Sequence, residues 1–224
     1  MSSEFVLPTL SEIEAAATVV YRAFAPTPQY RWALLSERLG ADCWVKHENH
    51  TPVGAFKIRG GLTFFDALAR RGALPREVIS ATRGNHGQSI ALAAARVGIP
   101  ATIVVPLGNS VEKNAAMRAF GAELIEHGAD FDEAKVEAAR LARERGLHMV
   151  PSFHATLVKG VATYALEFFR AAPDLAAVYV PIGMGSGICG MIAARDLLGV
   201  ETKIIGVVSE GAPAYALSFK AGKP

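Results

Sequence analysis

Residues 78–106 read VISATRGNHGQSIALAAARVGIPATIVVP, and this stretch decides the fold. It opens on a short apolar run, passes through a polar turn with two glycines, and continues as an alanine-rich segment that Gly98 and Pro100 end. A second apolar run, residues 101–105, follows and stops at Pro106. Two apolar runs that flank a helical segment, with short glycine or proline turns between them, are typical of a strand–helix–strand unit with parallel strands.

The same alternation extends over most of the chain. The strands are almost entirely apolar, as expected when helices cover both faces of a sheet. We therefore predict an α/β fold with two lobes, each an open, mostly parallel sheet with helices on both faces. Strands are expected at residues 43–46, 78–80, 101–105, 123–125, 148–150, 177–181 and 203–208, and helices at 9–21, 57–71, 89–97, 111–120, 131–145, 157–169 and 188–198.

The glycine and proline of residues 146–151 mark a place for the chain to cross between lobes. This crossing predicts a small α/β domain formed by residues 77–149. The large domain would then consist of residues 1–76 and 150–224. In such folds the loops that follow the strands meet at one edge of the sheet, where ligands bind.

The composition excludes several classes of function. The 224 residues are 51% hydrophobic and 20% charged, with a formal net charge of +2 and no basic run, so we expect no nucleic-acid partner. No stretch reaches the roughly 20 apolar residues that a membrane helix needs, and the N-terminus does not resemble a signal peptide. Cys43 and Cys189 are too few and too distant for a disulfide framework, which favours a cytoplasmic protein with reduced cysteines.

Lys57 stands in the stretch TPVGAFKIRGG, residues 51–61, and is the first candidate for catalysis. The apolar residues Phe56, Ile58 and Leu62 surround it. Because burying an ammonium is costly, a lysine in an apolar wall has a lowered pKa and offers a free amine, which is the basis of Schiff-base catalysis. A solvated lysine at the start of a helix is an equally simple interpretation of this segment alone.

Two further loops each join an expected strand to an expected helix. Residues 80–88 (SATRGNHGQ) are polar, and residues 183–190 (GMGSGICG) alternate with glycine. The N-terminus of a helix leaves backbone N–H groups unpaired, and glycine lets a phosphate or carboxylate approach them. Asn85 can both donate and accept, which suits a phenolic oxygen or a carboxylate. Both loops therefore favour ligand binding, while well-capped turns and close helix packing remain the simpler explanations.

Gly185, Gly187 and Gly190 also fit the spacing G-x-G-x-x-G of a dinucleotide-binding turn. Glu210 stands 20 residues beyond Gly190, where an acid would meet a ribose hydroxyl. This spacing predicts an NAD-dependent oxidoreductase. Two features weigh against it, because several strand–helix units precede the motif and because an NAD enzyme leaves Lys57 and the Asn85 loop without a task.

Taken together, these segments resemble the fold-type II pyridoxal 5'-phosphate (PLP) enzymes, whose fold is tryptophan synthase β-like. Within that family the chain is most similar to the threonine/serine dehydratase and serine racemase group. The matching segments occur in the family's order, from about Pro28 to Tyr215. They are residues 46–48 (KHE), 54–60 (GAFKIRG), 84–88 (GNHGQ), 160–163 (GVAT) with 166–167 (LE), and 181–190 (PIGMGSGICG).

The resemblance implies a role for each matching position. Lys57 would hold PLP as a Schiff base and later move the substrate's Cα proton, Phe56 would pack beside the ring, and Asn85 would bond to the 3-hydroxyl. The phosphate would take backbone amides from Gly183, Met184, Gly185, Ser186 and Gly187. The substrate carboxylate would lie against Thr82, Arg83, Gly84, Asn85 and His86.

The activity implied by the resemblance is PLP-dependent β-elimination. A small β-hydroxy amino acid such as threonine or serine would be dehydrated and deaminated to a 2-oxo acid and ammonia. The conjugated ring of the cofactor takes up the charge of the carbanion, and a lysine in contact acts as general base. The partner is then a small amino acid, and the resemblance also implies a homo-oligomer, with the dimer as its simplest form.

Arg83 departs from the family pattern, since the racemase branch has a serine there as the second base. A guanidinium stays protonated and cannot act as that base, so we expect no racemisation. Arg83 could instead contact an acidic substrate group, as in 3-hydroxyaspartate, although a solvated surface arginine is the simpler interpretation. The family's divalent-cation site needs several acids after the last strand, where this chain has only Glu210, and we expect no metal.

The chain ends at Gly222-Lys223-Pro224, before the strands with which members of this family continue. We therefore expect a large domain that is incomplete at its C-terminal end and a cofactor pocket that lacks the group meeting the pyridine nitrogen. A third hypothesis follows: a truncated, non-catalytic relative that binds a ligand through the same loops.

Overall fold

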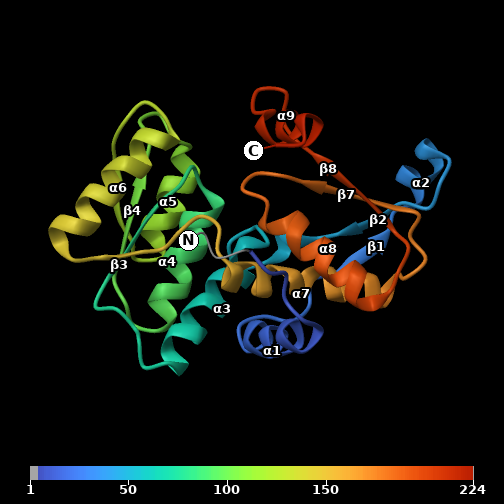
Figure 1. Cartoon of the computed structure of the whole chain (residues 1–224), viewed down its shortest axis with the longest axis horizontal. Helices are drawn as coiled ribbons and strands as arrows, with labels where there is room; N and C mark the ends of the chain where they lie inside the picture. The colour runs from blue at the N-terminus through green and yellow to red at the C-terminus, as the bar shows by residue number, and fades with distance from the viewer. Residues whose placement is uncertain (1–4, 224) are drawn as a thin grey trace.

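The computed structural model describes residues 5–223, in which the elements form two groups with one helix between them. Figure 1 shows the first group, with α4, α5 and α6, on the left and the second, with α7 and α8, on the right. Helix α3 (Lys57–Arg70) runs between the two. No helix within the described residues is both long and apolar enough to cross a bilayer.

The first group is built on a four-stranded parallel sheet in the order β5-β4-β3-β6. Helix α6 packs on one face through Ala134, Ala138 and Leu141 against Ile79 and Val104. Helix α4 covers the other face, so the central strands are buried on both sides. The elements are β3 (Val78–Ala81), α4 (Asn85–Arg96), β4 (Ala101–Val105), α5 (Val111–Ala119), β5 (Glu123–Glu126), α6 (Phe131–Arg145) and β6 (His148–Met149).

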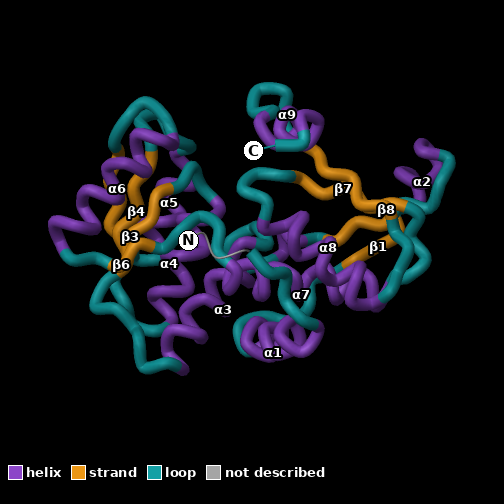
Figure 2. Tube along the Cα trace, viewed as in Figure 1, coloured by secondary structure: helices purple, strands orange, loops and turns teal. Residues whose placement is uncertain are grey.

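The second group contains two separate two-stranded sheets, drawn in orange in Figure 2. Strands β7 (Ala177–Pro181) and β8 (Lys203–Val207) run parallel, whereas β1 (Gln29–Arg31) and β2 (Trp44–Lys46) are antiparallel. A cavity of about 730 Å³ opens between β2 and β7. The helices of this group are α1 (Leu10–Tyr21), α2 (Ala33–Leu39), α7 (Ala155–Ala171), α8 (Ser186–Leu198) and α9 (Ala214–Ala221), with a short 3₁₀ turn, η1 (Glu48–His50).

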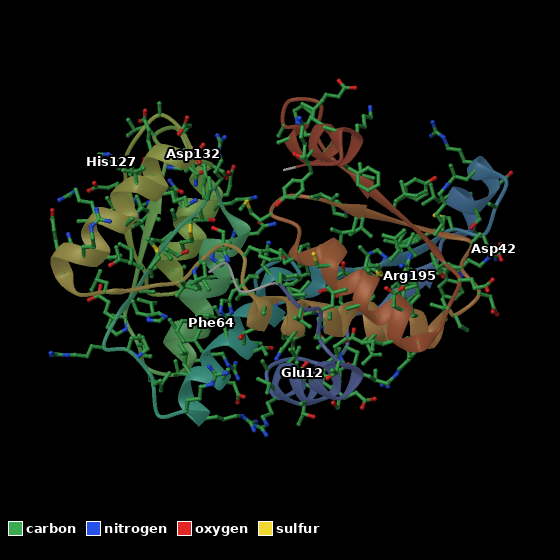
Figure 3. All side chains as sticks on the ribbon, in the orientation of Figure 1. Glu12, Asp42, Phe64, His127, Asp132 and Arg195 are labelled. Carbon is green, nitrogen blue, oxygen red and sulfur yellow. The ribbon has the colours of Figure 1, made fainter. Side chains whose placement is uncertain are left out.

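Helix α3 packs closely against α7 because glycines line the contact. A Cβ at Gly60 would come within 2.8 Å of the Leu157 carbonyl oxygen, and a Cβ at Gly160 would collide with the Arg59 carbonyl oxygen. Figure 3 shows Phe64, a buried residue of α3, between the group that contains His127 and Asp132 and the group that contains Glu12, Asp42 and Arg195. The helix that begins at Lys57 is therefore fixed by backbone contact.

The predicted α/β fold with mostly parallel sheets is confirmed, and each expected strand and helix is present. Three helices begin earlier than the sequence indicated. Helices α4, α7 and α8 start at Asn85, Ala155 and Ser186. The first turns of α4 and α8 are polar or glycine-rich and do not show the apolar periodicity. The short elements β1, α2 and α9 were not expected from the sequence.

Candidate active site

Lys57 is the first residue of α3 and lies in an apolar setting at the junction of the two groups. Its amine donates a hydrogen bond of 3.0 Å to the Ser186 hydroxyl and stands 5.3 Å from the centre of the Phe56 ring. Burial lowers the pKa of Lys57 from 10.5 to about 8. Lys57 is therefore an enclosed amine with a lowered pKa, and it points toward the glycine-rich loop after β7.

That loop carries a row of unpaired backbone donors. Within residues 5–223, none of the five N–H groups from Gly183 to Gly187 donates to a protein acceptor. Helix α8 starts at Ser186, and its N-cap Gly185 has φ +91°, a left-handed conformation that glycine adopts readily. Unpaired N–H groups and the positive end of the helix dipole together favour an anion such as phosphate.

Phe56 and Tyr164 pack against the Gly183–Gly187 loop and hold it in place. The Tyr164 hydroxyl donates to the Gly187 carbonyl oxygen at 3.2 Å, and the two rings are tilted with centroids 5.6 Å apart. A Cβ at Gly187 would be 3.2 Å from the tip of the Phe56 ring, so glycine lets the ring reach the loop. Gly190 serves helix packing instead, because a Cβ there would be 2.9 Å from the Cα of Ala162 on α7.

The Asn85 loop meets the same lysine from the other group. Ser89 of α4 donates a 2.7 Å hydrogen bond to the Lys57 carbonyl oxygen and so ties α4 to the start of α3. The Thr82 hydroxyl accepts from the N–H groups of Gly84 and Gly87, at 2.9 and 3.2 Å. Thr82 and Gly84 are thus occupied within the loop. The first N–H groups of α4, at Asn85 and His86, have no acceptor among the described residues.

His86 is buried beside Lys57 with an unused ring nitrogen. Its Nε2 has no hydrogen-bond partner among the residues that the structure describes, although the side chain is only 8% exposed. Burial first, and the nearby charge of Lys57 second, lower the pKa of His86 to about 3. The imidazole is therefore neutral at physiological pH and faces the lysine without competing for a proton.

Two cations flank the polar loop. Arg83 is exposed. The side chain of Lys113, at the start of α5, lies against Gly84, with its Nζ 3.0 Å from where a Cβ would stand. Neither cation forms an ion pair within residues 5–223. Sequence reasoning missed Lys113, Ser89 and Tyr164, because only the tertiary fold brings them to the loops.

The structure thus brings Lys57 and Phe56 next to the Gly183–Gly187 loop, and it brings His86 and the start of α4 to the same lysine. Met184 is 40% exposed and Arg83 and Asn85 are exposed, so these three side chains are open to an incoming ligand. Among the described residues, no group of three or more His, Cys, Asp or Glu side chains is arranged to hold a metal ion.

Comparison with known sequences places this chain in a protein family. The family model described as "Pyridoxal-phosphate dependent enzyme" matches residues 20–224. The biosynthetic L-threonine dehydratase IlvA of Haemophilus influenzae is 36% identical over 206 residues, which are 92% of this chain and 40% of that protein. The L-threonine ammonia-lyase of Geobacter sulfurreducens is 40% identical over 189 residues, which are 84% of this chain and 47% of that protein.

Solved structures agree with these matches. A pyridoxal 5'-phosphate-dependent aspartate racemase superposes with a TM-score of 0.89 at 26% identity, over 98% of this chain and 68% of that one. The processed form of threonine deaminase isoform 2 from Solanum lycopersicum gives a TM-score of 0.82 at 32% identity, over 98% and 67%.

The chain spans less than half the length of these two curated relatives. An NAD-dependent oxidoreductase, which the spacing of Gly185, Gly187 and Gly190 predicted as an alternative, does not agree with the family match over residues 20–224. Those glycines instead expose backbone donors and bring α8 against α7. The chain belongs to the family of pyridoxal-phosphate dependent enzymes.

Proposed function

We propose that this chain carries the lysine and the phosphate loop of an enzyme that eliminates water from a small β-hydroxy amino acid such as threonine or serine. The products are a 2-oxo acid and ammonia. One observation carries the proposal: the partly buried Lys57 amine lies 3.0 Å from the Ser186 hydroxyl, beside a loop whose five N–H groups have no acceptor among the described residues. The threonine dehydratases and the threonine ammonia-lyase among its relatives support this activity.

The residues around Lys57 fit PLP. The N–H groups of Gly183–Gly187 suit its phosphate, since they are unpaired and lie at a helix N-terminus. Lys57 supplies an amine of lowered pKa, and Phe56 supplies an apolar surface beside it. Asn85, exposed at the first position of α4, can donate to or accept from the 3-hydroxyl.

When it is bound, PLP supplies an electron-accepting ring that makes the substrate's Cα proton more acidic. The protein's part is to move that proton. With a pKa near 8, Lys57 has about 300-fold more free amine at pH 7 than an ordinary lysine of pKa 10.5, and it can act as the general base. The Ser186 hydroxyl accepts a hydrogen bond from Lys57 Nζ and so orients it.

The polar loop would hold the substrate. The unpaired N–H groups of Asn85 and His86 at the start of α4 suit the α-carboxylate, and the Thr82 hydroxyl keeps this turn in shape by accepting from Gly84 and Gly87. The neutral imidazole of His86 adds no charge near Lys57, so burial alone lowers the pKa of the amine.

A substrate with a second carboxylate, such as 3-hydroxyaspartate, is a further candidate within the same reaction. Arg83 is exposed and Lys113 lies over Gly84, so two cations without ion-pair partners among the described residues flank the polar loop. The similarity to an aspartate racemase, at 26% identity, also supports an acidic substrate. Racemisation is not part of the proposal, because Arg83 cannot serve as a base.

We also infer that residues 77–149 form a small domain and that residues 1–76 and 150–224 belong to a large one. The separate sheets support this division, because β3–β6 share no strand with the β7–β8 sheet. A homo-oligomer remains a prediction, which sedimentation equilibrium would test.

Reconstitution with PLP tests the proposal. We expect a visible absorbance band that disappears on borohydride reduction, leaves the cofactor attached to Lys57 by peptide mapping, and is absent from Lys57→Ala. Ammonia release from threonine, serine and 3-hydroxyaspartate then ranks the substrates. A protein that binds PLP through Lys57 but releases no ammonia would be a non-catalytic relative, and one that never takes up PLP would overturn the cofactor site itself.

A further inference from the structure

A buried ionic cluster lies behind Lys57, on the far side of α3. The guanidinium of Arg59, which is 0% exposed, bonds to both oxygens of Glu48 at 2.8 and 2.9 Å and to both oxygens of Glu167 at 2.6 and 3.0 Å. Lys46 adds an ion pair of 2.6 Å to Glu167. The cluster therefore has two cations and two carboxylates, and its net charge is zero.

The cluster joins four elements. Lys46 comes from β2, Glu48 from η1, Arg59 from α3 and Glu167 from α7. Arg59 also donates to the Thr163 hydroxyl at 3.0 Å, so it contacts two successive turns of α7. Lys46, Glu48, Arg59, Thr163 and Glu167 fall in the KHE, GAFKIRG, GVAT and LE segments, and the proposed reaction gives none of these five residues a task.

Stability alone is a weak reason for this arrangement. Taking four charges out of water is expensive, and well-packed apolar side chains in their place are often as stable or more so. Burial lowers the pKa of Arg59, but its bonds to Glu48 and Glu167 outweigh that effect and leave the pKa above its usual value. For Glu167, the bonds from Arg59 and Lys46 outweigh burial and hold the pKa below its usual value, so both groups stay charged.

The position of Arg59 relative to Lys57 suggests another purpose. On an α-helix, side chains that are two residues apart in the sequence point in directions that differ by about 200° around the helix axis. Arg59 therefore faces α7, while Lys57 faces Ser186. A forked guanidinium held by two carboxylates has one orientation, and it fixes the rotation of the first turn of α3.

We propose that this cluster is a positioning device for Lys57: it holds the first turn of α3 against α7 so that the amine faces Ser186, and the cancelling of its charges leaves that amine in neutral surroundings. The other titratable groups near the amine agree with such surroundings. His86 of α4 is neutral, burial raises the pKa of Tyr164 on α7 so that it stays protonated, and Lys57 itself forms no ion pair within residues 5–223. The purpose of the device rests on the proposed function, but its effect on Lys57 does not.

The test is the pKa of Lys57 in the protein without cofactor, read from the pH dependence of its labelling by trinitrobenzenesulfonate with peptide mapping. Lys46→Met leaves the cluster at −1 and should raise this pKa, whereas Glu48→Gln leaves it at +1 and should lower it. One charge at a distance of about 10 Å shifts a pKa by roughly one unit when the effective dielectric constant is near 20, and a shift of that order is expected. The double variant, with net charge zero, should return to the wild-type value.

A cluster that only stabilises the fold would give a different pattern. Loosening would expose Lys57 to water in all three variants and would raise its pKa toward 10.5 each time. Shifts in one direction, or no shift, would overturn the proposal. If Glu48→Gln does not fold, Lys46→Arg is the matched control, since it keeps the charge and should leave the pKa unchanged while Lys46→Met raises it. Because labelling needs neither PLP nor substrate, this outcome is independent of the proposed activity.

Discussion

Replacing Lys57 by methionine should stabilise the folded protein at neutral pH. Burial lowers the pKa of Lys57 from 10.5 to about 8, a difference of 2.5 units. At about 1.4 kcal/mol per unit, keeping the ammonium buried costs about 3 kcal/mol at pH 7. Methionine has a similar length and no charge. It loses the hydrogen bond to Ser186, worth about 1 kcal/mol, so the expected net gain is about 2 kcal/mol.

The pH dependence gives this prediction its sign. The folded pKa lies below the unfolded one, so between pH 8 and 10.5 the unfolded chain binds a proton that the folded chain has lost. The stability of the wild type therefore rises through this window, and the cost of the ammonium is fully present only below about pH 8. Near pH 10.5 the advantage of Lys57→Met should vanish and become a loss of about 1 kcal/mol.

Urea unfolding of the wild type and of Lys57→Met at pH 7 and at pH 10 measures the effect. The matched control is Lys135→Met on the exposed side of α6, which makes the same change in the unfolded chain. A Lys57→Met variant that is less stable than the wild type at pH 7, or whose difference from the wild type does not change with pH, would refute the reasoning. The amine would then be solvated and unsuited to the proposed chemistry.

Four other changes have defined outcomes. Gly160→Ala forces a Cβ into the Arg59 carbonyl and should cost about 1–3 kcal/mol in urea unfolding; a neutral result would mean that α3 and α7 are not in close contact. Glu167→Gln leaves Arg59 partly unpaired and should cost about 3–5 kcal/mol, against a negligible change for Glu144→Gln on exposed α6. The wild type should lose stability as pH falls from about 6.5 toward 3, because His86 takes up a proton in the unfolded chain but stays neutral in the folded one. His86→Gln should make this dependence of stability on pH weaker, and an unchanged slope would contradict the burial of His86 as a neutral ring. Arg83→Ala should lower the rate of ammonia release from 3-hydroxyaspartate more than from threonine, and an unchanged ratio of rates would leave Arg83 as a surface residue.

The fold was predictable because its signals are local. Thr9 and Glu12 form a capping box at the start of α1, with the Thr9 N–H donating to Glu12 at 2.9 Å, and β4 is buried at each of its five residues. Helix α2 and strand β1 escaped notice because they are short and their apolar residues are largely exposed. Periodicity reports burial of one face, and these elements have no such face.

The candidate site was predictable only in part. Lys57 and the Gly183–Gly187 loop stood out because an enclosed lysine and alternating glycines are unusual in the sequence itself. The ionic cluster did not, because Arg59 and Glu167 are 108 residues apart and nothing local shows that they meet. Lys113 was missed for the same reason, since only the packing of α5 beside the Asn85 turn brings it over Gly84.

The contact between α3 and α7 has a consequence for how this protein could be altered. At Gly60 and Gly160 main chain rests on main chain, so no side chain there can change rotamer to absorb a shift. The position of the Lys57 nitrogen is therefore set by the backbone, and core mutations that slide one helix would move it by the full distance of the slide. A new substrate preference is better sought at Met184 or Arg83, whose exposed side chains can be exchanged without moving either helix.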